Sequence, residues 1–124
     1  MFKDGLFALL IAMIATASFA QAQPKKGPNG GMVVTSQEHP IEFVLEGQKL
    51  IFYISDHDGS SLSTKDMRGR ATVQEGGKTA TVPLDPAAPN MMIGNLQAPL
   101  GSKARVVFSA NLHGHSLTAR YVTE

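Results

Sequence analysis

The chain contains no cysteine and no tryptophan among its 124 residues, and its aromatic residues are two tyrosines and six phenylalanines. The absence of cysteine excludes disulfide bonds, thiolate metal sites and a cysteine nucleophile. Excess charge is missing as well, because eleven lysines and arginines offset ten aspartates and glutamates and leave a formal net charge of +1. Proteins that bind nucleic acid usually carry a marked basic excess, so we expect no nucleic-acid partner.

Long apolar runs are also scarce, and the one that is present lies near the N-terminus. Lys3 precedes the apolar residues 6–17, and small residues at Ala20 and Ala22 offer two cleavage points, as in an export signal. This run is shorter than the roughly 20 residues that a membrane-spanning helix needs. The sequence therefore predicts a signal peptide over residues 1–22, a periplasmic protein, and no membrane span after cleavage.

The chain also has no pattern typical of an active site. It contains neither a nucleophile elbow nor a glycine-rich phosphate loop. Ser60 and Ser61 lie too close in sequence to His57 and Asp56 to build a serine triad with them. We predict that the protein is not an enzyme and has no catalytic residues.

What remains reads as a succession of short β-strands. Apolar runs rich in valine, threonine, isoleucine and aromatic residues are interrupted by turn residues every eight to twelve positions or so. Residues 23–31, rich in proline and glycine, predict a flexible leader before a single β-domain over residues 32–124. About seven or eight strands favour an all-β, antiparallel β-sandwich of the immunoglobulin-like kind, with a closed barrel as the main alternative.

Three hairpins organise this predicted domain. In the first, two alternating runs flank Gly47-Gln48, a two-residue loop that suits a tight turn and sets Phe43 opposite Phe52. A further short strand contains Gly94, which suggests a bulge. The predicted hairpins pair residues 41–46 with 49–55, residues 70–75 with 78–84, and residues 105–112 with 115–122.

The open end of the first hairpin gathers side chains that commonly bind metals. Extending the register outward brings His39 near Asp56, and His57 follows directly. Imidazole and carboxylate together suit Zn²⁺, Cu²⁺ or another transition-metal ion. Glu42 is a fourth candidate, although strand alternation places it on the opposite face from His39 unless Pro40 bends the chain. The candidate metal ligands are therefore His39, Asp56, His57 and Glu42.

The same residues also have a purely structural interpretation. Residues 56–59, Asp-His-Asp-Gly, are typical of an ordinary turn in which aspartate side chains bond their own backbone, and this interpretation is the commoner one. His113 and His115 flank a turn glycine, where they could chelate an ion together or simply decorate an exposed turn. Whether the two histidine pairs meet depends on how the hairpins pack.

Four segments together point to a family. They are Gly-Pro-Asn-Gly-Gly at 27–31, His-Pro-Ile-Glu-Phe at 39–43, Phe-Tyr-Ile-Ser-Asp-His-Asp-Gly at 52–59 and Leu-Thr-Ala-Arg-Tyr at 117–121. This set, within residues 27–122, resembles small exported bacterial proteins. It is also similar to the small periplasmic β-domain on adaptor subunits of heavy-metal efflux pumps of the resistance-nodulation-division type.

The resemblance implies an exported β-sandwich that works beside metal efflux, binding or handing over Zn²⁺, copper, Co²⁺ or Ni²⁺. His39 and Glu42 match the family's His/Glu pair, and Asp56 matches its strand-end aspartate. One position departs from the pattern, because the adaptor domains often carry a histidine before the double glycine and this chain has Asn29.

We therefore expect a periplasmic, non-catalytic protein that is associated with metal-ion handling or heavy-metal efflux and binds a divalent or copper ion weakly, or else carries no cofactor. The alternative is a metal-free interaction module that docks on an envelope efflux complex or another periplasmic protein through a sheet edge or loop end.

Overall fold

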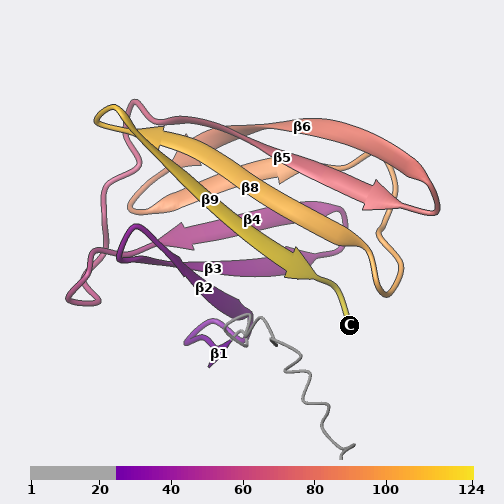
Figure 1. Cartoon of the computed structure of the whole chain (residues 1–124), viewed down its shortest axis with the longest axis horizontal. Helices are drawn as coiled ribbons and strands as arrows, with labels where there is room; N and C mark the ends of the chain where they lie inside the picture. The colour runs from indigo at the N-terminus through magenta and orange to yellow at the C-terminus, as the bar shows by residue number, and fades with distance from the viewer. Residues whose placement is uncertain (1–24) are drawn as a thin grey trace, which may run out of the picture.

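The computed structural model describes residues 25–124, so the predicted signal peptide and its cleavage points lie outside the described part of the chain. No helix within residues 25–124 is long and apolar enough to span a membrane. The regular elements of this part are β-strands (Figure 1): β1 (Lys25–Lys26), β2 (Met32–Ser36), β3 (His39–Glu46), β4 (Lys49–Ile54), β5 (Arg68–Glu75), β6 (Lys78–Ala87), β7 (Met91–Asn95), β8 (Arg105–Leu112) and β9 (His115–Val122).

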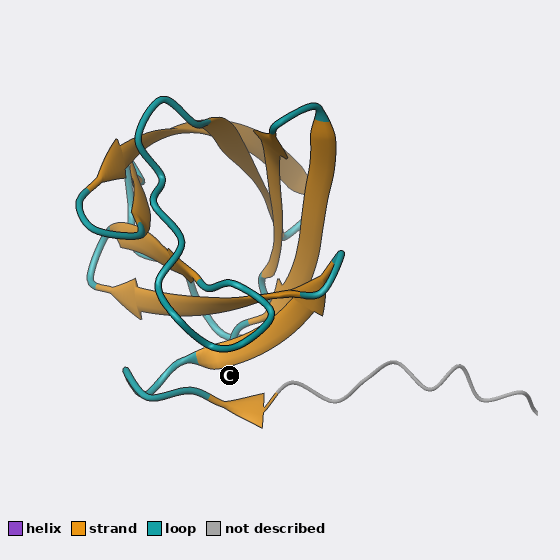
Figure 2. Ribbon diagram, turned by 90° about the vertical axis from the view of Figure 1, so that its left-hand side faces the viewer, coloured by secondary structure: helices purple, strands orange, loops and turns teal. Residues whose placement is uncertain are grey.

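The predicted all-β class is confirmed, but the expected sandwich of two sheets is not what the strands form. They make one nine-stranded antiparallel sheet in the order β1-β2-β3-β4-β7-β6-β5-β8-β9, curled strongly toward a half-barrel (Figure 2). The cause is the ten-residue strand β6. Its first part pairs with β5 and its last three paired residues, from Asp85 to Ala87, pair with β7. The curled sheet therefore has two walls, one formed by β1 to β4 with β7 and the other by β5, β8 and β9. Strand β6 pairs with both walls and joins them.

The three predicted hairpins and their registers are confirmed. Phe43 pairs with Phe52 across the first, and the Gly47-Gln48 loop joins Glu46 to Lys49. The second and third hairpins pair β5 with β6 and β8 with β9 in the predicted register. These pairings were accessible from sequence because each is local and closed by a two-residue turn.

Gly94 is not at a bulge, contrary to expectation. It pairs in regular register with Leu50, and a Cβ at this position would lie 2.7 Å from Leu84 Cδ2 and 2.8 Å from Val82 Cγ1. Glycine is needed here because β6 packs closely over β7, and not because the strand carries an extra residue.

Aromatic rings join the two walls of the curled sheet. Phe52 from β4 and Phe108 from β8 have ring centroids 4.7 Å apart, and Phe43 from β3 lies 5.2 Å from Tyr121 of β9. Such ring pairs stabilise a fold by about 0.5–1.5 kcal/mol each beyond the burial of their area. The core is therefore continuous between the two walls.

The two ends of the sheet approach each other without forming a ladder. The Thr118 amide of β9 donates to Ser36 Oγ of β2 at 3.0 Å, and the Tyr121 hydroxyl donates to the Ile41 carbonyl oxygen at 2.7 Å. Within residues 25–124, no strand pairing joins β2 to β9. Side-chain bonds, in place of backbone pairs, hold the curl closed, so the sheet is not a fully hydrogen-bonded barrel.

Candidate metal centre

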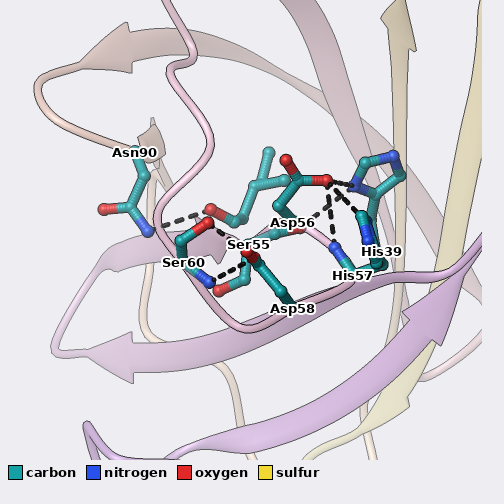
Figure 3. Close-up of polar contacts among 8 residues, drawn as sticks. His39, Ser55, Asp56, His57, Asp58, Ser60 and Asn90 are labelled. Atoms are coloured by element: carbon teal, nitrogen blue, oxygen red, sulfur yellow. Dashed lines mark hydrogen bonds and ion pairs between the residues drawn. The ribbon is translucent and has the colours of Figure 1, made fainter.

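The first hairpin extends beyond its last ladder pair and so positions the predicted cluster. The Ser55 amide donates to the Pro40 carbonyl oxygen at 2.9 Å, which carries the register outward to His39. The His39 Nδ1 atom lies 3.0 Å from the Ser55 carbonyl oxygen (Figure 3). A carbonyl oxygen only accepts, so Nδ1 of His39 carries the proton in this contact and a neutral ring keeps its free lone pair on Nε2.

Two imidazoles converge on one oxygen of Asp56. His39 Nδ1 lies 3.8 Å from Asp56 Oδ1, and His57 Nδ1 lies 3.4 Å from the same atom. The His57 amide also donates to that oxygen at 3.0 Å. The His39 side chain is 19% exposed, Asp56 41% and His57 72%. The structure thus brings together three of the residues that the sequence singles out, at the surface and open to solvent.

The turn after β4 uses Asp58 in the way that the structural interpretation predicts. The Ser60 hydroxyl donates to Asp58 Oδ1 at 2.6 Å and the Ser60 amide donates at 3.0 Å. These hydrogen bonds are the main reason that the pKa of Asp58 is lowered. Asn90 braces the base of the turn, because its side-chain amide donates to the Ile54 carbonyl oxygen at 3.0 Å. Asp58 is therefore a turn residue.

Glu42 does not belong to this cluster. It is 4% exposed and points toward the N-terminal turn, where its Oε2 accepts from the Asn29 amide at 2.9 Å and from the Gly31 amide at 2.8 Å. Its Oε1 accepts from Asn29 Nδ2 at 2.9 Å. Pro40 does not bend the strand, since it pairs with Thr35 inside a regular ladder. Alternation therefore keeps Glu42 and His39 apart.

Glu42 instead anchors the segment that the sequence predicts as a flexible leader. Gly27 and Gly31 close a turn through a bond of 2.8 Å between the Gly27 amide and the Gly31 carbonyl oxygen. Lys25 and Lys26 pair with Val33 and Met32 as β1. Residues 25–31 thus pair with β2 and contact the Glu42 carboxylate. Asn29 and the glycine pair Gly30-Gly31 indicate a turn in the sequence, but the sequence does not show that their N–H groups donate to Glu42.

His113 and His115 remain on the exposed β8–β9 turn. His113 adopts a positive φ of 50° and Gly114 one of 83°, as a tight hairpin turn requires. Within residues 25–124, no group of three or more histidine, aspartate or glutamate side chains is arranged to hold a metal ion. The two histidine pairs therefore do not join into one site, and His39, Asp56 and His57 are near one another without being preformed ligands.

No family model, curated protein or solved structure matches this chain.

Proposed function

We propose that this is an exported, periplasmic and non-catalytic protein of metal-ion handling, which captures a divalent or copper ion weakly at His39, Asp56 and His57. The observation that carries the proposal is the approach of both imidazole Nδ1 atoms to the same oxygen of Asp56, at 3.8 and 3.4 Å. Glu42 is not part of the proposed set, because its oxygens already accept three hydrogen bonds.

Of the two separations, the one between His57 Nδ1 and Asp56 Oδ1 is close to that expected for two ligands of one ion, whereas the 3.8 Å between His39 Nδ1 and Asp56 Oδ1 is longer. Donor–acceptor distances in good N–H···O bonds centre on about 2.9–3.0 Å. Ligand atoms bound tetrahedrally to one Zn²⁺ at about 2.0–2.1 Å lie about 3.3–3.4 Å from one another. The 3.4 Å between His57 Nδ1 and Asp56 Oδ1 matches this value, and the exposed His57 ring is free to adjust.

Binding must be weak for two reasons. His39 Nδ1 would have to give up its bond to the Ser55 carbonyl oxygen, or the ring would have to turn to offer Nε2. In addition, three ligands leave the remaining coordination position to water, at a site where His57 is 72% exposed. The mechanism that follows is capture and release of an ion, not permanent retention.

A titration of the metal-stripped protein with Zn²⁺ and Cu²⁺, observed by two-dimensional amide NMR, tests the proposal. We expect saturable shifts centred on His39, Asp56 and His57, and their loss in the His39→Ala/His57→Ala double variant. The matched control is His113→Ala/His115→Ala, which removes two exposed imidazoles from another turn and should leave the shifts intact. Shifts confined to the β8–β9 turn, or none at micromolar metal, would rule the proposed site out.

A further inference from the structure

Every arginine of the chain lies on one face of the curled sheet. Alternate residues of β5, β8 and β9 are buried in the core, among them Ala71, Phe108 and Ala119. The residues between them face outward, and they include all of the arginines: Arg68, Arg70, Arg105 and Arg120, each exposed. Below, the arginine face means the outward residues of β5, β8 and β9.

The ladder registers show how the arginine face is arranged. Arg70 lies opposite Ser109, which lies opposite Thr118. Arg68 lies opposite Asn111, which in turn lies opposite Ser116. These two rows line a shallow groove across the three strands. Hydroxyl and amide groups therefore lie beside the guanidinium groups of Arg68 and Arg70, and they offer hydrogen bonds to the same ligand.

No carboxylate neutralises the arginine face from within the described chain. The ion pairs found among residues 25–124 involve only histidines. Glu75, at the end of β5, accepts a bond of 2.7 Å from the Gly101 amide at the sheet end. Asp85 of β6 pairs through its backbone with Ile93 of β7, and no ion pair joins its side chain to an arginine among the described residues. The arginine face thus carries four guanidinium groups with no ion-paired carboxylate among residues 25–124, on a molecule whose formal net charge is only +1.

The presence of arginine and not lysine on this face restricts the kind of ligand that it can bind. The chain has more lysines than arginines, yet no lysine occupies the outward positions of these strands. Guanidinium groups bind carboxylates and phosphates through two parallel hydrogen bonds, whereas ammonium groups act as simple point charges. The placement of arginines and not lysines on these strands therefore favours recognition of defined acidic groups over diffuse attraction to a charged membrane surface.

The spacing between the arginines restricts the kind of ligand further. Residues two apart on a strand are about 6.6–6.8 Å apart, and neighbouring strands are about 4.7–4.9 Å apart. By the ladder registers, the backbone positions of neighbouring arginines on this face are therefore roughly 7–12 Å apart, and those of the most distant pair, Arg68 and Arg105, are roughly 20 Å apart. One small anion cannot engage all of them, but an extended chain with several acidic groups can. The outward residues of these strands include no aromatic side chain to stack on bases or sugar rings, which disfavours nucleic acid and carbohydrate.

We propose that the arginine face binds an extended, acidic segment of a partner protein, which lies across β5, β8 and β9. The inference does not depend on the metal site, and it gives the metal-free docking alternative a definite surface. Carboxylates of the segment pair with the guanidinium groups, and Ser109, Asn111 and Thr118 bond its remaining polar groups.

Fluorescence anisotropy with a labelled peptide of about 12 residues, alternating Glu and Ser, tests this inference. We expect saturable binding that weakens with added salt, and no binding of the Gln-for-Glu peptide. Exposed ion pairs measured singly contribute about 0.2–1 kcal/mol, so each Arg→Gln change should weaken binding about 1.4- to 5-fold. If the contributions add, the variant with all four arginines of the face changed to Gln should bind at least about 4-fold more weakly.

The matched control changes Lys25, Lys26, Lys49 and Lys65 to Gln, which alters the net charge by the same amount and should preserve binding. Replacing the arginines of the face by lysine should give an intermediate affinity. If that lysine variant binds as tightly as the native protein, or if the Lys→Gln control weakens binding equally, the arginine face is not the specific site. Tighter binding to phosphatidylglycerol vesicles, heparin or single-stranded oligothymidine than to the peptide would overturn the assignment to an acidic protein segment.

Discussion

Removal of the Glu42 carboxylate should release the N-terminal turn and destabilise the whole domain. Three N–H donors from Asn29 and Gly31 point at this side chain, at 2.8–2.9 Å. Hydrogen bonds to a charged group contribute about 1.5–3 kcal/mol each, but bonds that share one acceptor and one turn are not additive. For Glu42→Ala we expect the free energy of unfolding to fall by about 3–5 kcal/mol, because three N–H donors lose their ionised acceptor at once.

Glu42→Gln should cost much less, for a geometric reason. If the amide oxygen takes the place of Oε2, it still accepts from the Asn29 and Gly31 amides. The new NH₂ group then faces the Asn29 side chain, which can rotate its own amide and present Oδ1 as acceptor. All bonds are kept and only the charge is lost. Because charged bonds are roughly twice as strong as neutral ones, we expect a loss of about 1–2 kcal/mol.

Exchanging the carboxylate and the amide between Glu42 and Asn29 tests this explanation. Asn29→Asp alone sets two carboxylates against each other and should destabilise the fold, while Asn29→Asp combined with Glu42→Gln restores a donor opposite an acceptor and should recover most of that loss. Chemical denaturation followed by circular dichroism measures all variants. The control is Glu46→Gln, at an exposed strand end, which should change the free energy by less than about 0.5 kcal/mol. Equal losses for Glu42→Gln and Glu42→Ala, or no recovery in the double variant, would refute the account.

Three further predictions concern Tyr121, Asp58 and Gly31. Burial, with the charge of Glu42 as the second cause, raises the pKa of Tyr121 well above its ordinary 10.0. The folded state therefore holds this proton more tightly than the unfolded chain does, and the free energy of unfolding should fall as pH rises beyond about 10. Denaturation at pH 8 and pH 11 should show a fall that Tyr121→Phe reduces. Ser60→Ala should raise the pKa of Asp58 toward its ordinary value, as measured by carboxyl NMR titration, since the Ser60 hydroxyl bond is the largest cause of its lowering. Gly31→Ala should destabilise the domain by about 1–3 kcal/mol in urea denaturation, because its Cβ would clash with a carbonyl oxygen of β3.

The sequence by itself determined the hairpins and, through them, part of the candidate site. A period of two and a two-residue turn fix which residues face each other, so Phe43 opposite Phe52 could be predicted. The same register, continued by a few residues, brought His39 to Asp56. These contacts depend on segments that are adjacent in the chain and need no knowledge of how the hairpins pack.

Only the tertiary structure decided how the hairpins combine. Alternation predicts that Glu42 lies on the face away from His39, but it cannot show that the Asn29 turn folds onto that carboxylate. The double pairing of β6, which turned an expected sandwich into one curled sheet, depends on contacts with β5 and β7 at once. The arginine face needs the β5–β8 pairing, which joins strands separated by two others in the chain. Such non-local pairs leave no periodic signal in either segment, because each strand satisfies its own alternation whichever neighbour it meets.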